Sequence, residues 1–303
     1  MDAQPGGGRT DRPSDAIRLF DDRDFAWRRA GPTPRAVRAF GVRADDLGGL
    51  PGGAGCTWTD GRVVLKPVGY RPEHDWVCGV YTGWAGDDVR VPEPVAPAAE
   101  LGRGSWSVDG WGAHVFVPGR DADLDRELDL VRDASDAFHA CVADLPRPDF
   151  LEERQDPWAF ADRVAWEHAP PVGDPETLDL ITALTPRLRP VPAAEQPVHG
   201  DILPNVLVAD GRPPAVIDWP VYFRPAGLAP AIAVTDAVTF RGAPVGLLDA
   251  WRTGEHWDQL LVRALLYRLG ATGLIASRNR LMGALVTHAE RARPVVEAVL
   301  ARA

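Results

Sequence analysis

The side chains best suited to chemistry in this sequence are Asp201, Asn205 and Asp218. They flank two short apolar runs, 206–208 and 215–217, which are joined by a glycine-containing turn, and this pattern predicts a β-hairpin. The hairpin would bring the three polar side chains to one end. Two carboxylates and an amide oxygen suit Mg²⁺, a hard cation that prefers oxygen ligands. One carboxylate can remain free to accept a proton from a hydroxyl group.

The same residues can also be interpreted as turn formers, because Asp, Asn, Gly and Pro dominate turns for local backbone reasons. The ordered set is more specific: His199-Gly200-Asp201, then Asn205, then strand, turn, strand and Ile217-Asp218-Trp219. In this order the sequence resembles the aminoglycoside phosphotransferase and choline kinase superfamily, whose phosphotransfer core is related to that of protein kinases. Three residues separate Asp201 from Asn205, one fewer than in the superfamily pattern. This shorter loop and the segment 217–225 resemble a less characterised branch of high-GC bacteria.

The resemblance implies a role for each polar residue of the hairpin. Asp201 would orient a substrate hydroxyl and accept its proton, and Asn205 with Asp218 would hold Mg²⁺. His199 would brace the loop by hydrogen bonding. ATP would donate the phosphoryl group, since phosphoryl transfer asks the protein mainly for positioning and charge neutralisation. The acceptor would be a small hydroxylated molecule; an aminoglycoside, a choline-like alcohol, a sugar and an amino sugar are all compatible.

Lys66 is the single lysine among 33 lysine and arginine residues. The richness in Ala, Gly, Pro and Arg indicates codon pressure that turns tolerant lysines into arginines. A surviving lysine is therefore expected where a compact, flexible ammonium is needed rather than a planar guanidinium. A lysine that contacts phosphate meets that need, and chance survival is the alternative. Lys66 lies in the predicted strand 63–67, and in protein kinases the lysine that contacts the nucleotide phosphates also lies on a strand, the third.

A glycine-rich segment, 47–58, precedes Lys66 and includes Gly52, Gly53 and Gly55. Glycines let a backbone approach a phosphate closely, and their amides can form an anion-binding concavity. The segment is not a Walker loop, because no Gly-Lys-Ser/Thr follows. An ordinary flexible hairpin is the alternative. The order of glycine-rich loop and then lysine matches protein kinases, so these glycines are predicted to bind the nucleotide.

Two further nucleotide contacts are expected from position along a kinase-like chain. Val115, Phe116 and Val117 lie where kinases have the hinge between the lobes, whose backbone would hydrogen-bond adenine. Glu73, early in a predicted helix, is the nearest candidate to pair with Lys66 and orient it. The alternative for Glu73 is an acid that the helix macrodipole favours near a helix N-terminus.

Composition sets limits on partners and compartment. The 303 residues, 45% hydrophobic and 25% charged, are ordinary for a folded chain of two lobes or one large domain. The net charge of −10 argues against a nucleic-acid binder and gives a weak hint of a cationic substrate. Three distant cysteines favour reduced thiols in the cytoplasm. No apolar run approaches a membrane span and no signal peptide is visible, so a cytoplasmic protein without a membrane partner is expected, of unknown oligomeric state.

The elements around these residues predict a bilobal, protein-kinase-like α/β (α+β) fold. Residues 32–117 are predicted as an N-terminal nucleotide-binding lobe, an antiparallel five-stranded sheet with a helix. Residues 118–303 are predicted as a mainly helical catalytic and substrate-binding lobe that carries the hairpin, and 1–31 as a poorly ordered extension. The expected strands include 89–95, 105–108 and 112–117, and the expected helices of the second lobe are 122–143, 158–167, 175–188, 226–240, 244–252, 255–270 and 282–302.

Four residues outside the hairpin and the nucleotide contacts carry expectations of their own. Asp236 lies in an apolar helix, where a buried carboxylate needs a partner, and in the superfamily an acid downstream braces the catalytic loop. Tyr222 and Arg224 lie in a segment, 220–225, expected to be irregular, where they either face substrate or pack. His139 is expected to be a packing residue.

Two competing functions remain open at this stage. One is a nucleotide-binding pseudokinase that regulates a partner, which the shortened loop between Asp201 and Asn205 favours. The other is a plain helical binding module whose hairpin is only a turn-rich scaffold. The first would bind nucleotide without turnover, and the second would bind no ATP.

Overall fold

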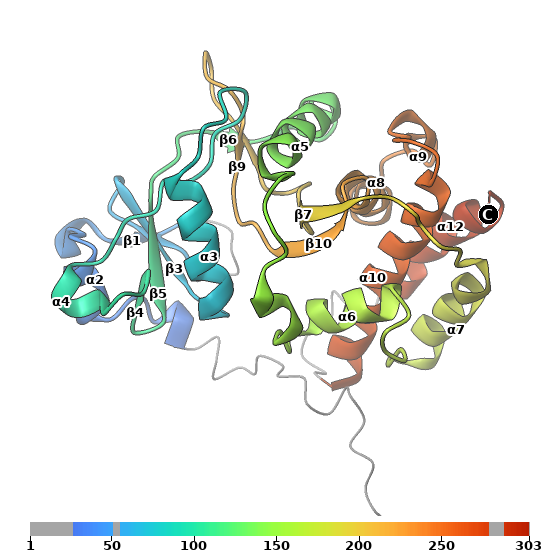
Figure 1. The fold of residues 1–303 in the computed structure, drawn as a ribbon, viewed down its shortest axis with the longest axis horizontal. Helices are drawn as coiled ribbons and strands as arrows, with labels where there is room; N and C mark the ends of the chain where they lie inside the picture. The colour runs from blue at the N-terminus through green and yellow to red at the C-terminus, as the bar shows by residue number, and fades with distance from the viewer. Residues whose placement is uncertain (1–26, 51–54, 279–287, 303) are drawn as a thin grey trace, which may run out of the picture.

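The computed structural model describes residues 27–50, 55–278 and 288–302, and it places an N-terminal sheet beside a larger, mainly helical part (Figure 1). The sheet is antiparallel with strand order β1-β2-β3-β5-β4, which confirms the predicted five-stranded sheet. Its strands are β1 (Gly48–Gly49), β2 (Trp58–Thr59), β3 (Val63–Pro67), β4 (Ser107–Val108) and β5 (Trp111–Val115), accompanied by the helices α2 (Pro34–Ala39), α3 (Arg71–Thr82) and α4 (Ala99–Gly102).

The turn between β2 and β3 is built around Asp60, whose carboxylate accepts hydrogen bonds from the backbone N–H groups of Arg43, Arg62 and Val63. Burial alone would raise the pKa of Asp60, but these bonds to its charged form lower it to about 2. The turn joins β2 to β3, in whose register Trp58 lies opposite Leu65. On its other side β3 pairs with β5, where Lys66 lies opposite Gly112. Lys66 is therefore held on a central strand of the sheet.

Residues 89–95 do not form a strand, so that prediction is wrong. The segment is extended but makes only isolated bridges, Arg90 with Ala215 and Pro94 with His114. Its prolines have no N–H group to donate to a β-ladder, so they interrupt continuous pairing.

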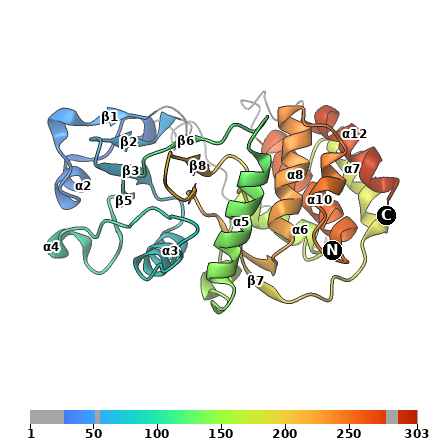
Figure 2. The ribbon, with the colours of Figure 1, turned by 90° about the horizontal axis from the view of Figure 1, so that it is seen from above.

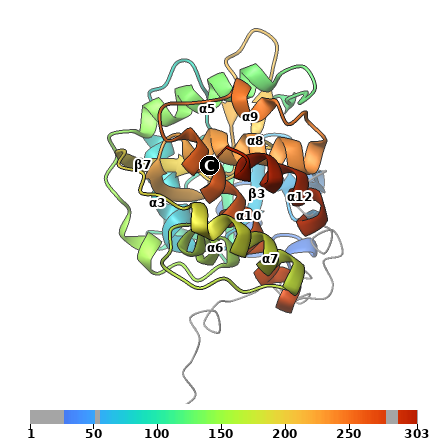
Figure 3. The same ribbon diagram turned by 90° about the vertical axis from the view of Figure 1, so that its right-hand side faces the viewer.

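The C-terminal part is mainly helical, as predicted, and Figure 3 shows α6, α7, α8 and α12 around α10. Its helices are α5 (Leu128–Val142), α6 (Pro157–Ala165), α7 (Pro175–Leu184), α8 (Leu228–Arg241), α9 (Leu247–Ala250), α10 (Trp257–Arg278) and α12 (His288–Leu300). Asp174 caps α7 through the N–H of Thr177, as its position before Pro175 predicts.

Helix α10 is the buried centre of this part. The stretch Trp257–Ser277 is long and apolar enough for a membrane span by length and composition, contrary to the expectation that no run approaches that length. However, 83% of its most apolar window is buried inside the protein. Burial of this kind identifies α10 as a core helix, packed against α6, α7, α8 and α12.

A three-stranded sheet carries the predicted hairpin. Strands β8 (Val206–Val208) and β9 (Ala215–Val216) form the hairpin, and β6 (Arg120–Asp121) pairs with the outer side of β8. The pairing of β6 delays α5, which begins at Leu128 rather than near residue 122.

Residues 221–225 are not irregular, contrary to expectation. They form β10 (Val221–Pro225), which pairs with β7 (Glu195–His199). The loop that follows His199 therefore starts from a paired strand.

Helix α3 joins the two parts through aromatic side chains. Trp76 and Tyr81 of α3 approach Trp219 with ring centroids 5.3 and 6.0 Å apart, and Phe138 of α5 meets the same ring at 4.9 Å. Val77 and Tyr81 belong to the large core of the C-terminal part, whereas the sheet has its own core around Leu65 and Trp111. Seen from above, α5 lies between the sheet and α8 (Figure 2).

Candidate active site

Lys66 and Asp218, 152 residues apart in sequence, meet in an ion pair between Nζ and Oδ1. Lys66 extends from β3, and Asp218 follows β9 at the base of the hairpin. Their side chains are 28% and 47% exposed, so both are open to a ligand. Asp218 has a φ of 51°, in the left-handed region that few residues other than glycine adopt. Such a conformation at a solvent-open carboxylate is typical of functional sites.

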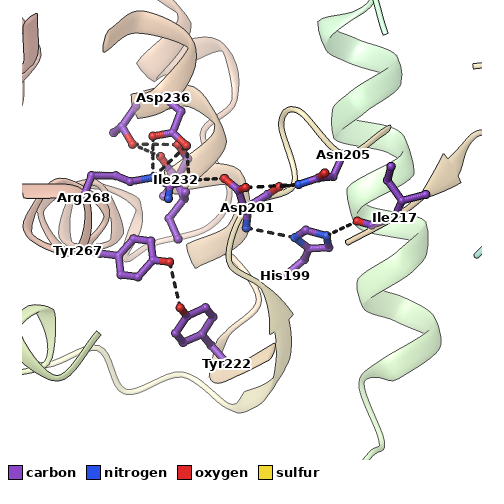
Figure 4. A network of polar contacts seen from close by, with 11 residues as sticks. His199, Asp201, Asn205, Ile217, Tyr222, Ile232, Asp236, Tyr267 and Arg268 are labelled. Atoms are coloured by element: carbon purple, nitrogen blue, oxygen red, sulfur yellow. Dashed lines mark hydrogen bonds and ion pairs between the residues drawn. The ribbon is translucent and has the colours of Figure 1, made fainter. Parts of the chain in front are cut away.

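His199 organises the loop that carries Asp201. Its Nδ1 accepts the backbone N–H of Asp201 at 3.1 Å, and its Nε2 lies 3.0 Å from the carbonyl oxygen of Ile217 (Figure 4). One nitrogen must accept and the other donate, so the ring is the neutral Nε2–H tautomer. Complete burial lowers the pKa of His199, which favours this neutral form. His199 thus links the loop to the hairpin strand and does no proton transfer.

His139 supports His199 from α5. Its Nε2 accepts the backbone N–H of His199 at 3.0 Å, and its Nδ1 lies 2.6 Å from the carbonyl oxygen of Ser135. Burial lowers the pKa of His139 to about 4, so it is neutral at pH 7. The expectation of a satisfied packing histidine is confirmed by these contacts.

The shortened loop brings Asn205 against Asp201. Asn205 Nδ2 donates to the backbone carbonyl of Asp201 at 2.6 Å and lies 3.4 Å from its Oδ2. The N–H of Ile217 donates to the carbonyl oxygen of Asn205 at 2.9 Å, which ties the loop to the hairpin. Because the amide nitrogen is used within the loop, Asn205 Oδ1 is left as the acceptor atom of that side chain.

Two side chains of this site offer oxygen atoms that suit a small hard cation. Asn205 Oδ1 and the Asp218 oxygen that does not contact Lys66 are oxygen donors of the kind that Mg²⁺ prefers. Mg²⁺ is commonly held by one or two carboxylates together with waters and substrate phosphates, so a short list of protein ligands fits it. Lys66 beside Asp218 adds positive charge where phosphates would bind.

Asp201 is also held from the far side by Arg268 of α10. Arg268 Nη2 donates to Asp201 Oδ1 at 2.6 Å, and Arg268 Nε donates to both oxygens of Asp236 at 2.9 and 3.1 Å (Figure 4). Asp236 therefore braces the loop that carries Asp201, as predicted, but it does so through an arginine. Sequence reasoning missed Arg268, although a buried aspartate that needs a cationic partner was a signal to look for one in a neighbouring apolar helix.

A family model described as "Phosphotransferase enzyme family" matches residues 66–233, which is more than half of the chain and includes every side chain of the cluster except Arg268 and Asp236. The chain belongs to this family. No curated protein sequence matches it significantly.

Solved structures resemble this phosphotransferase over most of its length. A thermostable mutant of aminoglycoside phosphotransferase APH(4)-Ia, in a ternary complex with AMP-PNP and hygromycin B, shares 16% identity with a TM-score of 0.56, covering 87% of this chain and 97% of that one. The GDP complex of aminoglycoside 2'-phosphotransferase-IIIa shares 13% identity with a TM-score of 0.54, covering 86% and 93%. An aminoglycoside phosphotransferase from Alicyclobacillus acidocaldarius shares 15% with a TM-score of 0.53, covering 90% and 95%. These likenesses establish the kinase-like fold.

Glu73 does not pair with Lys66 in this phosphotransferase, so that expectation is wrong. One oxygen of Glu73 accepts from Arg154 Nη1 at 3.0 Å and from the backbone N–H of Val221 at 2.8 Å. The aromatic packing of α3 on Trp219 turns the start of the helix toward β10. Glu73 therefore fastens α3 to the C-terminal part.

Near Lys66 the structure places a histidine that sequence reasoning missed. Val64 lies opposite His114 in the β3–β5 register, so His114 is on the same face of the sheet as Lys66. Burial, with the nearby charges of His74 and Lys66, lowers the pKa of His114 to about 3. The side chain is therefore neutral beside Lys66. Its position two residues from Gly112, the partner of Lys66 in β5, was the signal that could have found it.

The predicted glycine-rich loop and hinge are placed only in part. Gly52 and Gly53 lie outside the described residues, and Gly55 has a φ of 71°, which suits glycine. Two N–H groups of the predicted hinge are used inside the protein: that of Val115 donates to the carbonyl oxygen of Glu93 and that of Phe116 to the carbonyl oxygen of Arg62, at 2.8 and 2.7 Å. Within the described part of the chain, the Val117 amide has no such partner.

Tyr222 and Arg224 are buried packing residues. Tyr222 is buried, and its hydroxyl lies 3.0 Å from that of Tyr267 (Figure 4). Arg224 forms an ion pair with Asp162 at 2.6 Å, and its guanidinium lies over the ring of Trp166. Both residues hold β10 in place.

Proposed function

We propose that this phosphotransferase transfers the γ-phosphoryl group of ATP to a hydroxyl of a small molecule in the presence of Mg²⁺. The observation that carries the proposal is the convergence of Lys66, Asp218 and the loop 201–205 from separate elements of the fold. Lys66 offers the positive charge, and Asn205 and Asp218 the oxygen ligands, that phosphoryl transfer needs. Asp201 adds a second carboxylate from the same loop as Asn205.

Each residue has a distinct proposed role. Lys66 contacts the α- and β-phosphates, and Asn205 with Asp218 holds Mg²⁺, which when bound would neutralise charge on the phosphate oxygens. Asp201 orients the acceptor hydroxyl and takes up its proton at a carboxylate oxygen. Metal binding at Asp218 would weaken its attraction for Lys66, because the two cations share one carboxylate, and would leave the ammonium free for phosphate.

The nucleotide is proposed to lie between the parts 32–117 and 118–303. Gly52, Gly53 and Gly55 are proposed to line the phosphates with backbone amides. With the amides of Val115 and Phe116 used inside the protein, Val117 is the hinge residue whose N–H is proposed to meet the base.

The acceptor is proposed to be small. A cavity of about 340 Å³ opens beside the loop 201–205, lined by Leu203 and Pro204 of that loop. Asp121, Asp123 and Asp125 line the same cavity and Arg241 completes it. The excess of carboxylates and the net charge of −10 support a hydroxylated acceptor that also carries positive charge.

A regulatory pseudokinase is less well supported. The shortened loop, which favours that alternative in the sequence, still holds Asn205 within hydrogen-bonding distance of Asp201. The side chains for metal, phosphate and proton thus remain together. A plain helical module is incompatible with the family and with the sheet.

The test measures thermal stability with ATP, and separately with GTP, in the presence and absence of Mg²⁺. A ligand that binds only the folded state raises the melting temperature, and we expect the rise only when nucleotide and metal are both present. No rise at millimolar nucleotide with Mg²⁺ contradicts the proposal.

The proposed base is tested by Asp201→Asn once a screen of small hydroxyl compounds for ATP consumption has found an acceptor. Nucleotide affinity should stay within a few-fold, while turnover falls by roughly 10²–10⁴, the range for a lost general base. Asp210→Asn, in the exposed turn of the same hairpin, is the control and should behave as wild type. Unchanged turnover in Asp201→Asn excludes it as the base.

A further inference from the structure

Arg268 occupies a position between two carboxylates of different exposure. Its own side chain is 13% exposed and that of Asp236 is 10%, whereas Asp201 is 40% exposed. The guanidinium uses its Nε–H and one Nη2–H on Asp236 and reaches Asp201 with Nη2. The buried pair of Arg268 and Asp236 is therefore an anchor in the core, and Arg268 reaches from it to the more exposed side chain of Asp201.

The anchor has a fixed geometry because of its surroundings. Asp236 lies on α8 and Arg268 on α10, two helices that pack against each other in the core. The guanidinium is planar and donates in fixed directions, unlike an ammonium, which rotates freely. The face of Tyr267 lies 5.1 Å from the guanidinium carbon and further restricts it. An arginine held this way can set the direction of the carboxylate that it contacts.

The two oxygens of Asp201 have different environments. Oδ1 accepts the bond from Arg268 at 2.6 Å, whereas among the described residues Oδ2 has only the long 3.4 Å approach of Asn205 Nδ2. Oδ2 is therefore the oxygen with capacity to accept another hydrogen bond. With Oδ1 held from the core and the backbone N–H held by His199, the side chain has one orientation in the loop.

We propose that Arg268, anchored by Asp236, is a positioning residue that holds Oδ1 of Asp201 so that Oδ2 faces the acceptor hydroxyl. This inference rests on the proposed function, in which Asp201 receives the proton. Arg268 does not touch the reacting atoms, and it acts through Asp201. The alternative is that the three charges only stabilise the contact between α8 and α10.

The main test variant is the double substitution Arg268→Met with Asp236→Asn, which removes the positioning contact without leaving an unpaired buried charge. Arg263→Met is the matched control. Arg263 is also a buried arginine of α10, but it donates to the carbonyl oxygens of Ala165 and Arg189, not to Asp201. Arg268→Lys is a second variant that keeps the positive charge but loses the planar guanidinium, in case the double variant fails to fold.

Two measurements are made on each variant. The first is the rate of Mg²⁺-dependent ATP hydrolysis, with water as acceptor, together with the affinity for MgADP. The second is carbodiimide labelling of Asp201 followed by mass spectrometry, which needs no activity. Both Arg268 variants should bind MgADP within a few-fold of wild type and hydrolyse ATP roughly 10- to 100-fold more slowly, the scale of a misplaced catalytic group. Labelling of Asp201 should rise several-fold in both variants and stay unchanged in Arg263→Met.

The outcomes separate this inference from the proposed function. Wild-type labelling and hydrolysis in a folded Arg268 variant overturns the positioning role, and so does slower hydrolysis that Arg263→Met reproduces equally. If wild type binds no MgADP and hydrolyses no ATP, the proposed function fails. In that case the labelling of Asp201 still tests the contact with Arg268. Unchanged labelling in the Arg268 variants overturns the positioning role as well, and raised labelling supports the role of Arg268 in orienting the carboxylate.

Discussion

Replacing Glu73 by alanine tests whether this residue serves the nucleotide, as the kinase order implies, or the junction of the two parts, as its contacts indicate. Its carboxylate is 17% exposed, joins Arg154 and accepts the N–H of Val221, which is fully buried. Glu73→Ala removes both contacts at once. We expect a loss of stability with little change in the affinity for nucleotide.

The size of the loss can be worked out from the contacts. A hydrogen bond to a charged group contributes about 1.5–3 kcal/mol, and an unsatisfied buried N–H costs about 1–3 kcal/mol. Arg154 is not left as a lone buried charge, because its Nε still donates to Asp156 at 2.8 Å. Burial raises the pKa of Glu73 despite Arg154, so desolvation offsets part of the attraction. We therefore expect the free energy of unfolding to fall by about 2–3 kcal/mol, less than the sum of the two contributions.

The measurement is urea unfolding, in which the midpoint should fall while the slope is unchanged. Glu153→Ala is the control. Glu153 is a carboxylate near the same junction, but within the described ranges it accepts a single, exposed bond from Tyr70, so its loss should change stability by less than about 0.5 kcal/mol. A Glu73→Ala protein with wild-type stability and lost nucleotide affinity refutes the reasoning, because it would mean that Glu73 does orient Lys66.

Two further predictions concern Lys66 and His139. Lys66→Arg should leave stability in urea unchanged but weaken nucleotide binding at least tenfold, which is about 1.4 kcal/mol, because a bulkier planar group replaces a compact ammonium beside Asp218. Titration calorimetry measures the affinity. Equal affinity in both proteins would remove the argument from the single lysine. His139 has a pKa of about 4 in the folded protein against an ordinary value of 6.5, so the unfolded chain binds more protons and stability falls as pH drops from 6.5 to about 4. The slope of unfolding free energy against pH reports how many more protons the unfolded chain binds. In that window His139→Gln should reduce this number by up to about one, and an unchanged slope contradicts a neutral buried His139.

The local sequence determined the β8–β9 hairpin and the polar residues beside it. Asp201, Asn205 and Asp218 lie within one short stretch whose apolar runs and turn specify antiparallel pairing, and neighbouring strands joined by a tight turn need no distant contact to find each other. His199 was assigned to bracing for the same reason, since its hydrogen-bond partners, Asp201 and Ile217, belong to that stretch. The single lysine on a predicted strand and the five-stranded sheet likewise follow from short-range patterns.

Tertiary packing decided which charges meet. Glu73 lies in the first turn of an amphipathic helix that packs on Trp219 through aromatic contacts. Trp219 is more than a hundred residues away, so the partner of Glu73 could not be inferred from its sequence distance to Lys66. Arg268 is one of many arginines, and only the packing of α10 against α8 places it between Asp236 and Asp201. A buried charge must find an opposite charge, but the sequence states only that need. The crossing of two core helices selects the residue that meets it.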